Sequence, residues 1–144
     1  MLAPKRTKYR KYQKGTLKNI AQNCNGLQFG QYGLQSCHSG VMSAKTIEAV
    51  RRCIRRDLKR VGALWIRVFP DIPVTRKPAE VRMGKGKGSI SFWASKIRPG
   101  QILYELDGVP LHVAKKAAKI ADSKLPFNTR FVALAGLPPA LKTT

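Results

Sequence analysis

The chain has 144 residues, of which 43% are hydrophobic, so it is long enough to form one domain with a buried core. Lysine and arginine total 28 against 7 aspartates and glutamates, and the net charge of +21 predicts a polyanionic partner, first a nucleic acid and second an anionic membrane. No apolar run approaches the roughly 18 residues that a membrane-spanning helix requires, so no such helix is predicted.

Residues 1–20 form a basic block without a single acid, in which Tyr9 and Tyr12 stand among the cations. Like charges repel and little apolar surface is available, so this block is not expected to fold alone or to supply core residues. We expect an arm that becomes ordered on RNA, with its tyrosines stacked on bases or riboses; the alternative is a solvated tail. The predicted RNA-binding residues of the arm are Lys5, Arg6, Lys8, Arg10, Lys11 and Lys14.

Residues 21–42 are rich in Gly, Asn, Gln and Ser, with single apolar residues between them. The glycines at positions 26, 30 and 33 exclude a continuous helix. We expect a short strand or an irregular loop that packs on the domain.

The clearest predicted helix spans residues 43–61, with Ser43 as its N-cap and Gly62 as the residue just past its end. Its apolar residues recur at helical spacing and form one stripe: Ile47, Val50, Ile54, Leu58 and Val61. The other sides are basic, whereas a solvated helix normally mixes both signs of charge. We therefore expect these sides to face phosphates, through Arg51, Arg52, Arg55, Arg56 and Lys59.

The rest of the chain predicts strands at residues 63–69, 81–83, 90–97, 102–106 and 127–134, and a second helix at residues 110–125. Two helices among about five strands, without strict βαβ alternation, predict an α+β fold with two helices packed on a mainly antiparallel sheet. We expect one α+β RNA-binding domain over residues 21–134 and a C-terminal tail over residues 135–144.

The most unusual segment is a glycine/lysine-rich hairpin loop, which we call the glycine loop: Arg82, Met83, Gly84, Lys85, Gly86, Lys87 and Gly88. A Walker A motif would need glycine where Val81 or Ala79 stands, and a dinucleotide motif would need it at Ser89. The glycines let the backbone approach a phosphate closely, and the lysines add charge. We expect a mobile loop that follows an RNA backbone; the alternative is a plain hairpin tip.

Catalysis and metal binding have little support in the sequence. Neither His38 nor His112 stands in a metal or catalytic motif, and the seven acids are scattered. The three cysteines, Cys24, Cys37 and Cys53, lack C-x-x-C spacing, and we expect them to be reduced small apolar residues. No enzyme, metal or cofactor is therefore predicted.

These segments together resemble the bacterial-type ribosomal protein sixteen of the large subunit, a universal ribosomal family. The resemblance opens on MLAPKRTKYRK (1–11) and covers about residues 1–133. It is strongest in WIRVFPD (65–71), KP (77–78), RMGKGKGS (82–89), LYE (103–105) and DGVP (107–110). It implies an α+β fold and a structural role in the large subunit. It also implies binding to large-subunit rRNA near the peptidyl-transferase centre, with the arm and the glycine loop approaching A-site tRNA.

The resemblance implies neighbouring large-subunit ribosomal proteins as further partners, and we expect no membrane partner and no homo-oligomer. Because it begins at Met1, we expect the basic N-terminus to be the mature arm, although its composition also resembles a mitochondrial transit peptide. Sequence drift and the cysteines favour a ribosome of the mitochondrial matrix, with bacterial cytoplasm and plastid stroma as alternatives. The competing functions are a basic nucleic-acid-binding chaperone or assembly protein outside the mature ribosome, and a small enzyme that acts on RNA.

Overall fold

The computed structural model describes residues 2–15, 17 and 19–134, so the predicted C-terminal tail lies outside the described residues. The elements are β1 (Tyr32–Ser36), β2 (Gly40–Ser43), α1 (Ala44–Asp57), β3 (Ala63–Ile66), β4 (Ile72–Arg76), β5 (Ser89–Ile97), β6 (Ile102–Asp107), α2 (Leu111–Asp122) and β7 (Thr129–Ala133). The predicted α+β class is confirmed.

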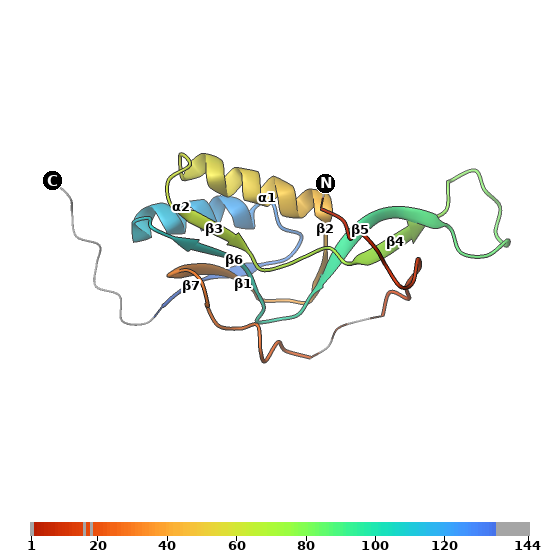
Figure 1. Ribbon diagram of the computed structural model, residues 1–144, viewed down its shortest axis with the longest axis horizontal. Coiled ribbons are helices and arrows are strands. Elements are labelled where there is room, and N and C mark those ends of the chain that lie inside the picture. Colours follow the sequence, from red (N-terminus) through yellow and green to blue (C-terminus); the bar gives the residue numbers. More distant parts are fainter. Residues whose placement is uncertain (1, 16, 18, 135–144) are drawn as a thin grey trace.

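The strands of the described residues form two antiparallel sheets, where the sequence predicted one. A four-stranded sheet has the order β3-β6-β1-β7, and a three-stranded sheet has the order β2-β5-β4. The central strand β1 places Leu34 opposite Tyr104 of β6 and Phe131 of β7. Both helices cover one face of the four-stranded sheet, while β4 and β5 extend away from it toward the glycine loop (Figure 1).

The core lies between the helices and the four-stranded sheet. The predicted stripe of α1 is confirmed for four residues that are at most 3% exposed, namely Ile47, Val50, Ile54 and Leu58, whereas Val61 is 59% exposed. From α2, the small residues Ala114, Ala117 and Ala121 are fully buried. The buried Tyr104 of β6 donates its hydroxyl to the carbonyl oxygen of Ile47 at 3.0 Å, which fixes α1 on the sheet.

The first helix begins where the sequence predicted but ends four residues earlier. At its start, the Ser43 hydroxyl accepts a hydrogen bond from the Thr46 backbone N–H at 3.1 Å. At its end, Lys59 adopts a positive φ of 50°, and the N–H of Arg60 donates to the carbonyl oxygen of Arg55. This is a Schellman turn, in which Lys59 directly follows the C-cap Leu58, the place predicted for Gly62.

Some of the predicted strands and helix ends are wrong. Residues 81–83 lie in a loop, where Val81 is 53% and Met83 98% exposed. The strand falls instead at Ile72–Arg76, and Pro73 is compatible with it because β4 lies at a sheet edge. The first predicted strand ends at residue 66 rather than 69, and the second helix spans residues 111–122 rather than 110–125. Residues 21–42, predicted as a short strand or loop, contain β1 and most of β2.

Candidate nucleic-acid interface

The outer side of α1 and the turn after it carry six cations around one shallow hollow of about 500 Å³. We call this group the α1 ridge: Arg51, Arg52, Arg55, Arg56, Lys59 and Arg60. The sequence predicted five of the six. Arg60 was missed because periodicity does not show that the turn after α1 folds it back beside the helix.

Glu48 organises the N-terminal part of the α1 ridge. Its carboxylate accepts hydrogen bonds from Arg51 at 2.7 and 2.8 Å and from Arg52 at 2.8 Å. These bonds, with Arg51 making the larger contribution, lower the pKa of Glu48 to about 2. Glu48 therefore stays ionised and holds both guanidinium groups in place.

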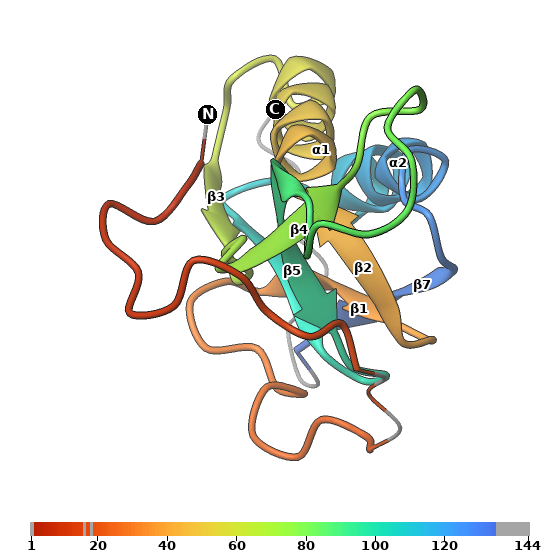
Figure 2. The ribbon, with the colours of Figure 1, turned by 90° about the vertical axis from the view of Figure 1, so that its right-hand side faces the viewer.

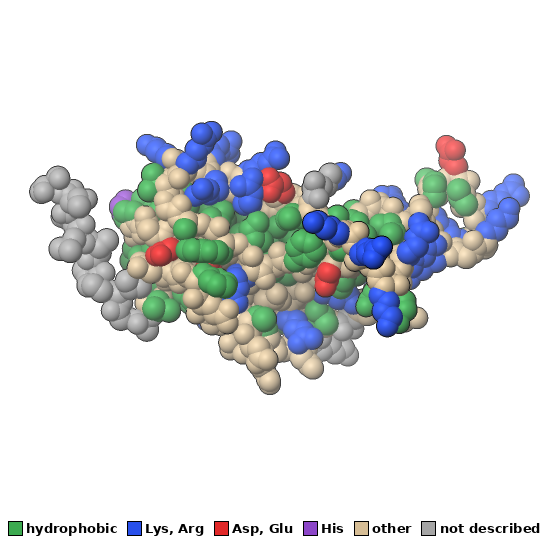
Figure 3. All heavy atoms as spheres, in the orientation of Figure 1, with side chains coloured by type: hydrophobic (Ala, Val, Ile, Leu, Met, Phe, Trp, Pro, Cys, Tyr) green, Lys and Arg blue, Asp and Glu red, His purple; other side chains and the backbone are tan. Residues whose placement is uncertain are grey.

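The C-terminal part of the α1 ridge is not neutralised in this way. Among the described residues, no acid forms an ion pair with Arg55, Arg56, Lys59 or Arg60. Arg55 instead donates to the carbonyl oxygen of Gly62 at 2.8 Å. Figure 3 shows lysine and arginine side chains over α1 and again over the end of the molecule that holds the arm and the glycine loop. The unpaired cations make this surface suited to phosphates.

The arm does not project freely into solvent in this structure. Leu2 is partly buried and packs against the core, which corrects the expectation that the arm supplies no core residue. Further on, the arm crosses β4 and β5 (Figure 2), where residues 12–15 line a groove against these strands. The six predicted RNA-binding residues, Lys5, Arg6, Lys8, Arg10, Lys11 and Lys14, are all exposed. The arm thus presents its charges outward from a fixed path.

The glycine loop is exposed from residue 82 to residue 87. Gly84 and Gly86 have φ of 102° and 79°, and an added Cβ at either position would meet nothing within 4 Å. Backbone conformation, rather than crowding, is therefore what favours glycine there. Lys77, which was not among the predicted site residues, donates from its Nζ to the carbonyl oxygen of Gly84 and braces the loop.

The structure brings the arm and the glycine loop together. The Nζ of Lys11 donates to the carbonyl oxygen of Lys87 at 2.7 Å, and the Nζ of Lys87 donates to the carbonyl oxygen of Tyr12. These reciprocal bonds join segments about 75 residues apart in the sequence. The α1 ridge lies apart from them, over the four-stranded sheet (Figure 1). The predicted site residues thus fall on two separate basic surfaces.

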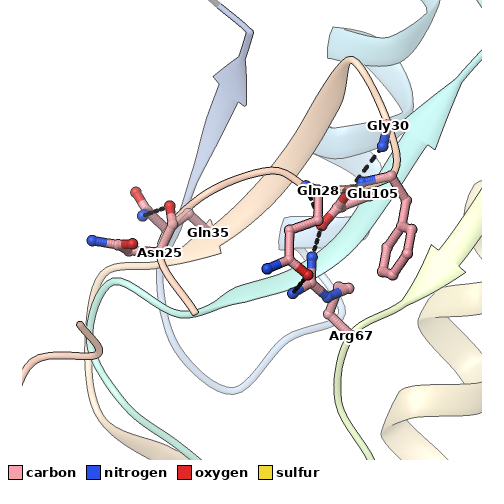
Figure 4. Close-up of polar contacts among 7 residues, drawn as sticks. Asn25, Gln28, Gly30, Gln35, Arg67 and Glu105 are labelled. Atoms are coloured by element: carbon pink, nitrogen blue, oxygen red, sulfur yellow. Dashed lines mark hydrogen bonds and ion pairs between the residues drawn. The ribbon is translucent and has the colours of Figure 1, made fainter. Parts of the chain in front are cut away.

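The sequence analysis missed a buried polar cluster around Glu105 on β6. This side chain is fully buried, and its carboxylate accepts backbone hydrogen bonds from Phe29 at 2.7 Å and Gly30 at 2.9 Å. The guanidinium of Arg67 forms an ion pair with the same carboxylate and also donates to the Gln28 side chain at 2.9 Å. Figure 4 shows these groups converging on Glu105. The cluster fixes the loop that precedes β1.

Opposing influences act on the pKa of Glu105. Burial raises it, but the backbone donors of residues 28–30 and the Arg67 guanidinium lower it by more, so the pKa lies below its ordinary value. The ionised carboxylate holds Phe29 in an exposed position, where its ring stacks on Trp65 at 6.1 Å and lies under Arg67 at 5.1 Å. One signal in the sequence could have pointed to this cluster: Glu105 is an acid within the otherwise apolar strand predicted at residues 102–106.

The structure also bears on metal-binding clusters, membrane-spanning helices and paired cysteines. In the described part of the chain, no three His, Cys, Asp or Glu side chains lie close enough to share a metal ion. Within the same residues, no helix has the length and apolar character needed to cross a membrane. Cys53 is buried, as expected of a small apolar residue, whereas Cys24 and Cys37 are exposed, and all three are free thiols.

Comparison with known proteins gives consistent results over nearly the whole chain. Residues 4–132 match the family described as ribosomal protein L16p/L10e. The large ribosomal subunit protein uL16 of Rhodospirillum centenum is 54% identical over 136 residues, which cover 94% of this chain and 96% of that protein. The large ribosomal subunit protein uL16m of Prototheca wickerhamii is 53% identical over 132 residues, which cover 92% of this chain and 98% of that protein.

Proposed function

Because the chain belongs to the ribosomal protein L16p/L10e family, we infer that it is a structural constituent of the large ribosomal subunit and not an enzyme. We propose that it binds large-subunit rRNA near the peptidyl-transferase centre and helps to position A-site tRNA. We further propose a division into an arm of residues 1–20 and an rRNA-binding domain of residues 21–134. Neighbouring ribosomal proteins of the large subunit are its further proposed partners.

The observation that carries the tRNA part of the proposal is the junction of the arm and the glycine loop. Two basic segments, distant in sequence, are held together by Lys11 and Lys87 at one end of the molecule. The exposed backbone around Gly84 and Gly86 can approach a phosphate without steric hindrance. Charge and an open backbone suit the junction to nucleic-acid phosphates, and we propose that these belong to the A-site tRNA.

The α1 ridge is the proposed anchor on rRNA. Arginine presents a planar fork that matches a phosphate, and five of the six residues of the ridge are arginine. The ridge also surrounds the C-terminal end of α1, where the helix dipole favours cations. Because α1 is packed into the core, the backbone from which four of these arginines extend is held in place.

For the compartment, we propose a bacterial-type ribosome of the mitochondrial matrix, with bacterial cytoplasm and plastid stroma as the alternatives. The near-equal identity to a bacterial uL16 and to uL16m is compatible with both a bacterial and a mitochondrial ribosome. Fractionation of the source cell, followed by detection of the chain in purified organelles, distinguishes them.

Sedimentation tests the function as a whole. We expect the chain in stoichiometric amount in the large-subunit fraction of a sucrose gradient, at salt concentrations that remove loosely bound proteins. A chaperone or assembly protein outside the mature ribosome would appear instead with free RNA or with immature particles. That distribution would contradict the proposal.

A further inference from the structure

The outward face of the three-stranded sheet is unusually apolar. Side chains on one face of a strand alternate, and residues directly opposite on neighbouring strands share that face. The register therefore places seven residues on one face: Val41, Ser43, Ile72, Val74, Phe92, Ala94 and Lys96. The solvent side of an antiparallel sheet is normally polar. Because five of these seven residues are apolar, we expect another segment of the chain or a partner to cover this face.

The arm covers the face only in part. A groove of about 440 Å³ remains between residues 12–15 of the arm and the sheet. Beside the arm, Val41 is still 53% exposed and Phe92 38% exposed. Tyr12 lines the groove from the arm, and its carbonyl oxygen accepts the hydrogen bond from Lys87 that holds this wall in place. The groove is therefore bounded by elements of defined position and has room for a ligand.

The charge around the groove indicates which ligand it takes. Three lysines line it, each from a different element: Lys14 from the arm, Lys87 from the glycine loop and Lys96 from β5. None of the lining residues is acidic. An aromatic ring on an apolar floor, surrounded by ammonium groups, matches a nucleobase and the phosphates on either side of it.

We propose that this groove binds one unpaired nucleobase of the large-subunit rRNA. The base stacks on Phe92, with Tyr12 on the arm side, and the flanking phosphates lie against Lys14 and Lys96. This inference rests on the proposed function and deepens it, because it names the kind of rRNA element that the arm side of the protein recognises. The arm is then one wall of a base-binding site as well as a carrier of charge.

Photo-crosslinking in reconstituted large subunits tests the inference directly. The full chain carries benzoyl-phenylalanine at position 92, and a matched control carries it at position 111, because Leu111 on α2 is exposed to a similar degree, 41%. We expect position 92 to crosslink to rRNA at one or two adjacent unpaired nucleotides that position 111 does not reach. Crosslinks from position 92 only to a ribosomal protein would overturn the inference in favour of a protein segment. The same nucleotides from both positions would also overturn it.

Measuring rRNA affinity at several salt concentrations distinguishes the contribution of base stacking from that of lysine–phosphate contacts. Base–aromatic stacking predicts that Phe92→Ala weakens binding about five- to a hundredfold while the slope of log Kd against log salt stays unchanged. Lys96→Ala should lower that slope by roughly 0.7, as expected for one contact to a single strand. Leu111→Ala is the control and should match the wild type, and the thermal midpoints of all variants are measured alongside.

The two proposals fail in different ways. Wild-type affinity of Phe92→Ala, in a chain that binds rRNA with a steep salt dependence, would reject the groove and leave the proposed function intact. Absence of salt-dependent rRNA binding by the wild type would reject the proposed function itself.

Discussion

The Nζ of Lys11 donates a hydrogen bond of 2.7 Å to the carbonyl oxygen of Lys87, 76 residues further along the chain. The side chain of Lys87 returns a bond to the carbonyl oxygen of Tyr12. Backbone carbonyl groups thus take the place of acids, which are scarce in this chain, and hold two cationic segments together despite their repulsion. The consequence is that the arm and the glycine loop respond to changes as one unit.

The first prediction separates two lysines of the glycine loop that look equivalent in the sequence. Lys87→Ala removes the bond to Tyr12, whereas Lys85 makes no such bond among the described residues. We expect Lys87→Ala to accelerate tryptic cleavage of the arm after Arg10, Lys11 and Lys14, and Lys85→Ala to leave it at the wild-type rate. Both changes are on exposed side chains, so stability should stay within about 0.5 kcal/mol. Equal cleavage rates of the arm in the two variants would show that the bond does not hold the arm.

The second prediction concerns tRNA. In large subunits reconstituted with Arg82→Ala and Lys85→Ala combined, we expect subunit formation to be normal, because the α1 ridge is untouched and the bond of Lys87 to the arm is kept. A-site binding of aminoacyl-tRNA and the rate of translation should both fall. If Arg82 makes a bidentate phosphate contact, Arg82→Ala alone should have a larger effect than Lys85→Ala. Wild-type tRNA affinity in the double variant would leave the glycine loop as a plain hairpin tip.

The third prediction concerns the arm. Deletion of residues 2–14 should leave a folded domain with a lower thermal midpoint, because Leu2 packs against the core. Loss of a partly buried leucine costs about 1 kcal/mol, and Leu2→Ala should account for most of the effect. The deletion, but not Leu2→Ala, should also weaken rRNA binding and subunit assembly. Circular dichroism measures the thermal midpoint, and sucrose gradients measure subunit assembly. A global loss of fold on deletion would show that the arm belongs to the domain.

The sequence predicted the features that depend on local pattern and on charge. The apolar stripe of α1 and its N-cap at Ser43 follow from helical spacing and from the hydroxyl of one residue. The end of α1 was misplaced because Lys59 adopts a conformation that favours glycine, and hydrogen bonds back to the helix compensate for it. The residue type gives no sign of this conformation, because lysine rarely adopts a positive φ.

The features that could not be predicted depend on contacts between distant segments. β4 was missed because proline usually ends a strand, and only its place at a sheet edge makes Pro73 acceptable. The junction of Lys11 with Lys87 and the cluster around Glu105 each join residues about 75 positions apart. These contacts depend on how the chain folds back on itself, and the spacing of apolar residues does not show which distant segments meet. The basic site residues were found from composition, but their division into two surfaces was not.

The fourth prediction addresses the α1 ridge. With on the order of ten phosphate contacts, affinity for the rRNA should fall by about 10³–10⁵ between 50 and 200 mM salt. Arg56→Gln with Arg60→Gln should lower the slope of log Kd against log salt by roughly 1.8, since each contact to a duplex contributes about 0.9. Lys119→Gln on α2, which also removes an exposed cation, is the matched control and should leave the slope unchanged. Equal slopes for the ridge variant and the control would place the rRNA contact elsewhere.

The fifth prediction follows from the lowered pKa of Glu105. A carboxyl group whose pKa is lower in the folded state than in the unfolded state adds stability above its unfolded pKa. That stability is lost as the pH falls through the folded value. The free energy of unfolding of the wild type should therefore decrease as the pH falls below about 4.5, the ordinary pKa of this group. Urea unfolding at a series of pH values measures this dependence.

Glu105→Gln isolates the contribution of this one carboxylate. At pH 7 the change leaves Arg67 without its partner, and breaking a buried pair in this way costs about 3–5 kcal/mol. Because the wild type itself loses the charge in acid, the difference between the two proteins should shrink as the pH falls below 4.5. The Phe29–Trp65 stack should loosen in the variant at pH 7, which tryptophan fluorescence reports. The control is Glu80→Gln, an exposed acid beside the glycine loop, for which no such difference is expected. A destabilisation of Glu105→Gln that is the same at pH 7 and in acid would show that packing, rather than the charge of Glu105, holds the loop before β1.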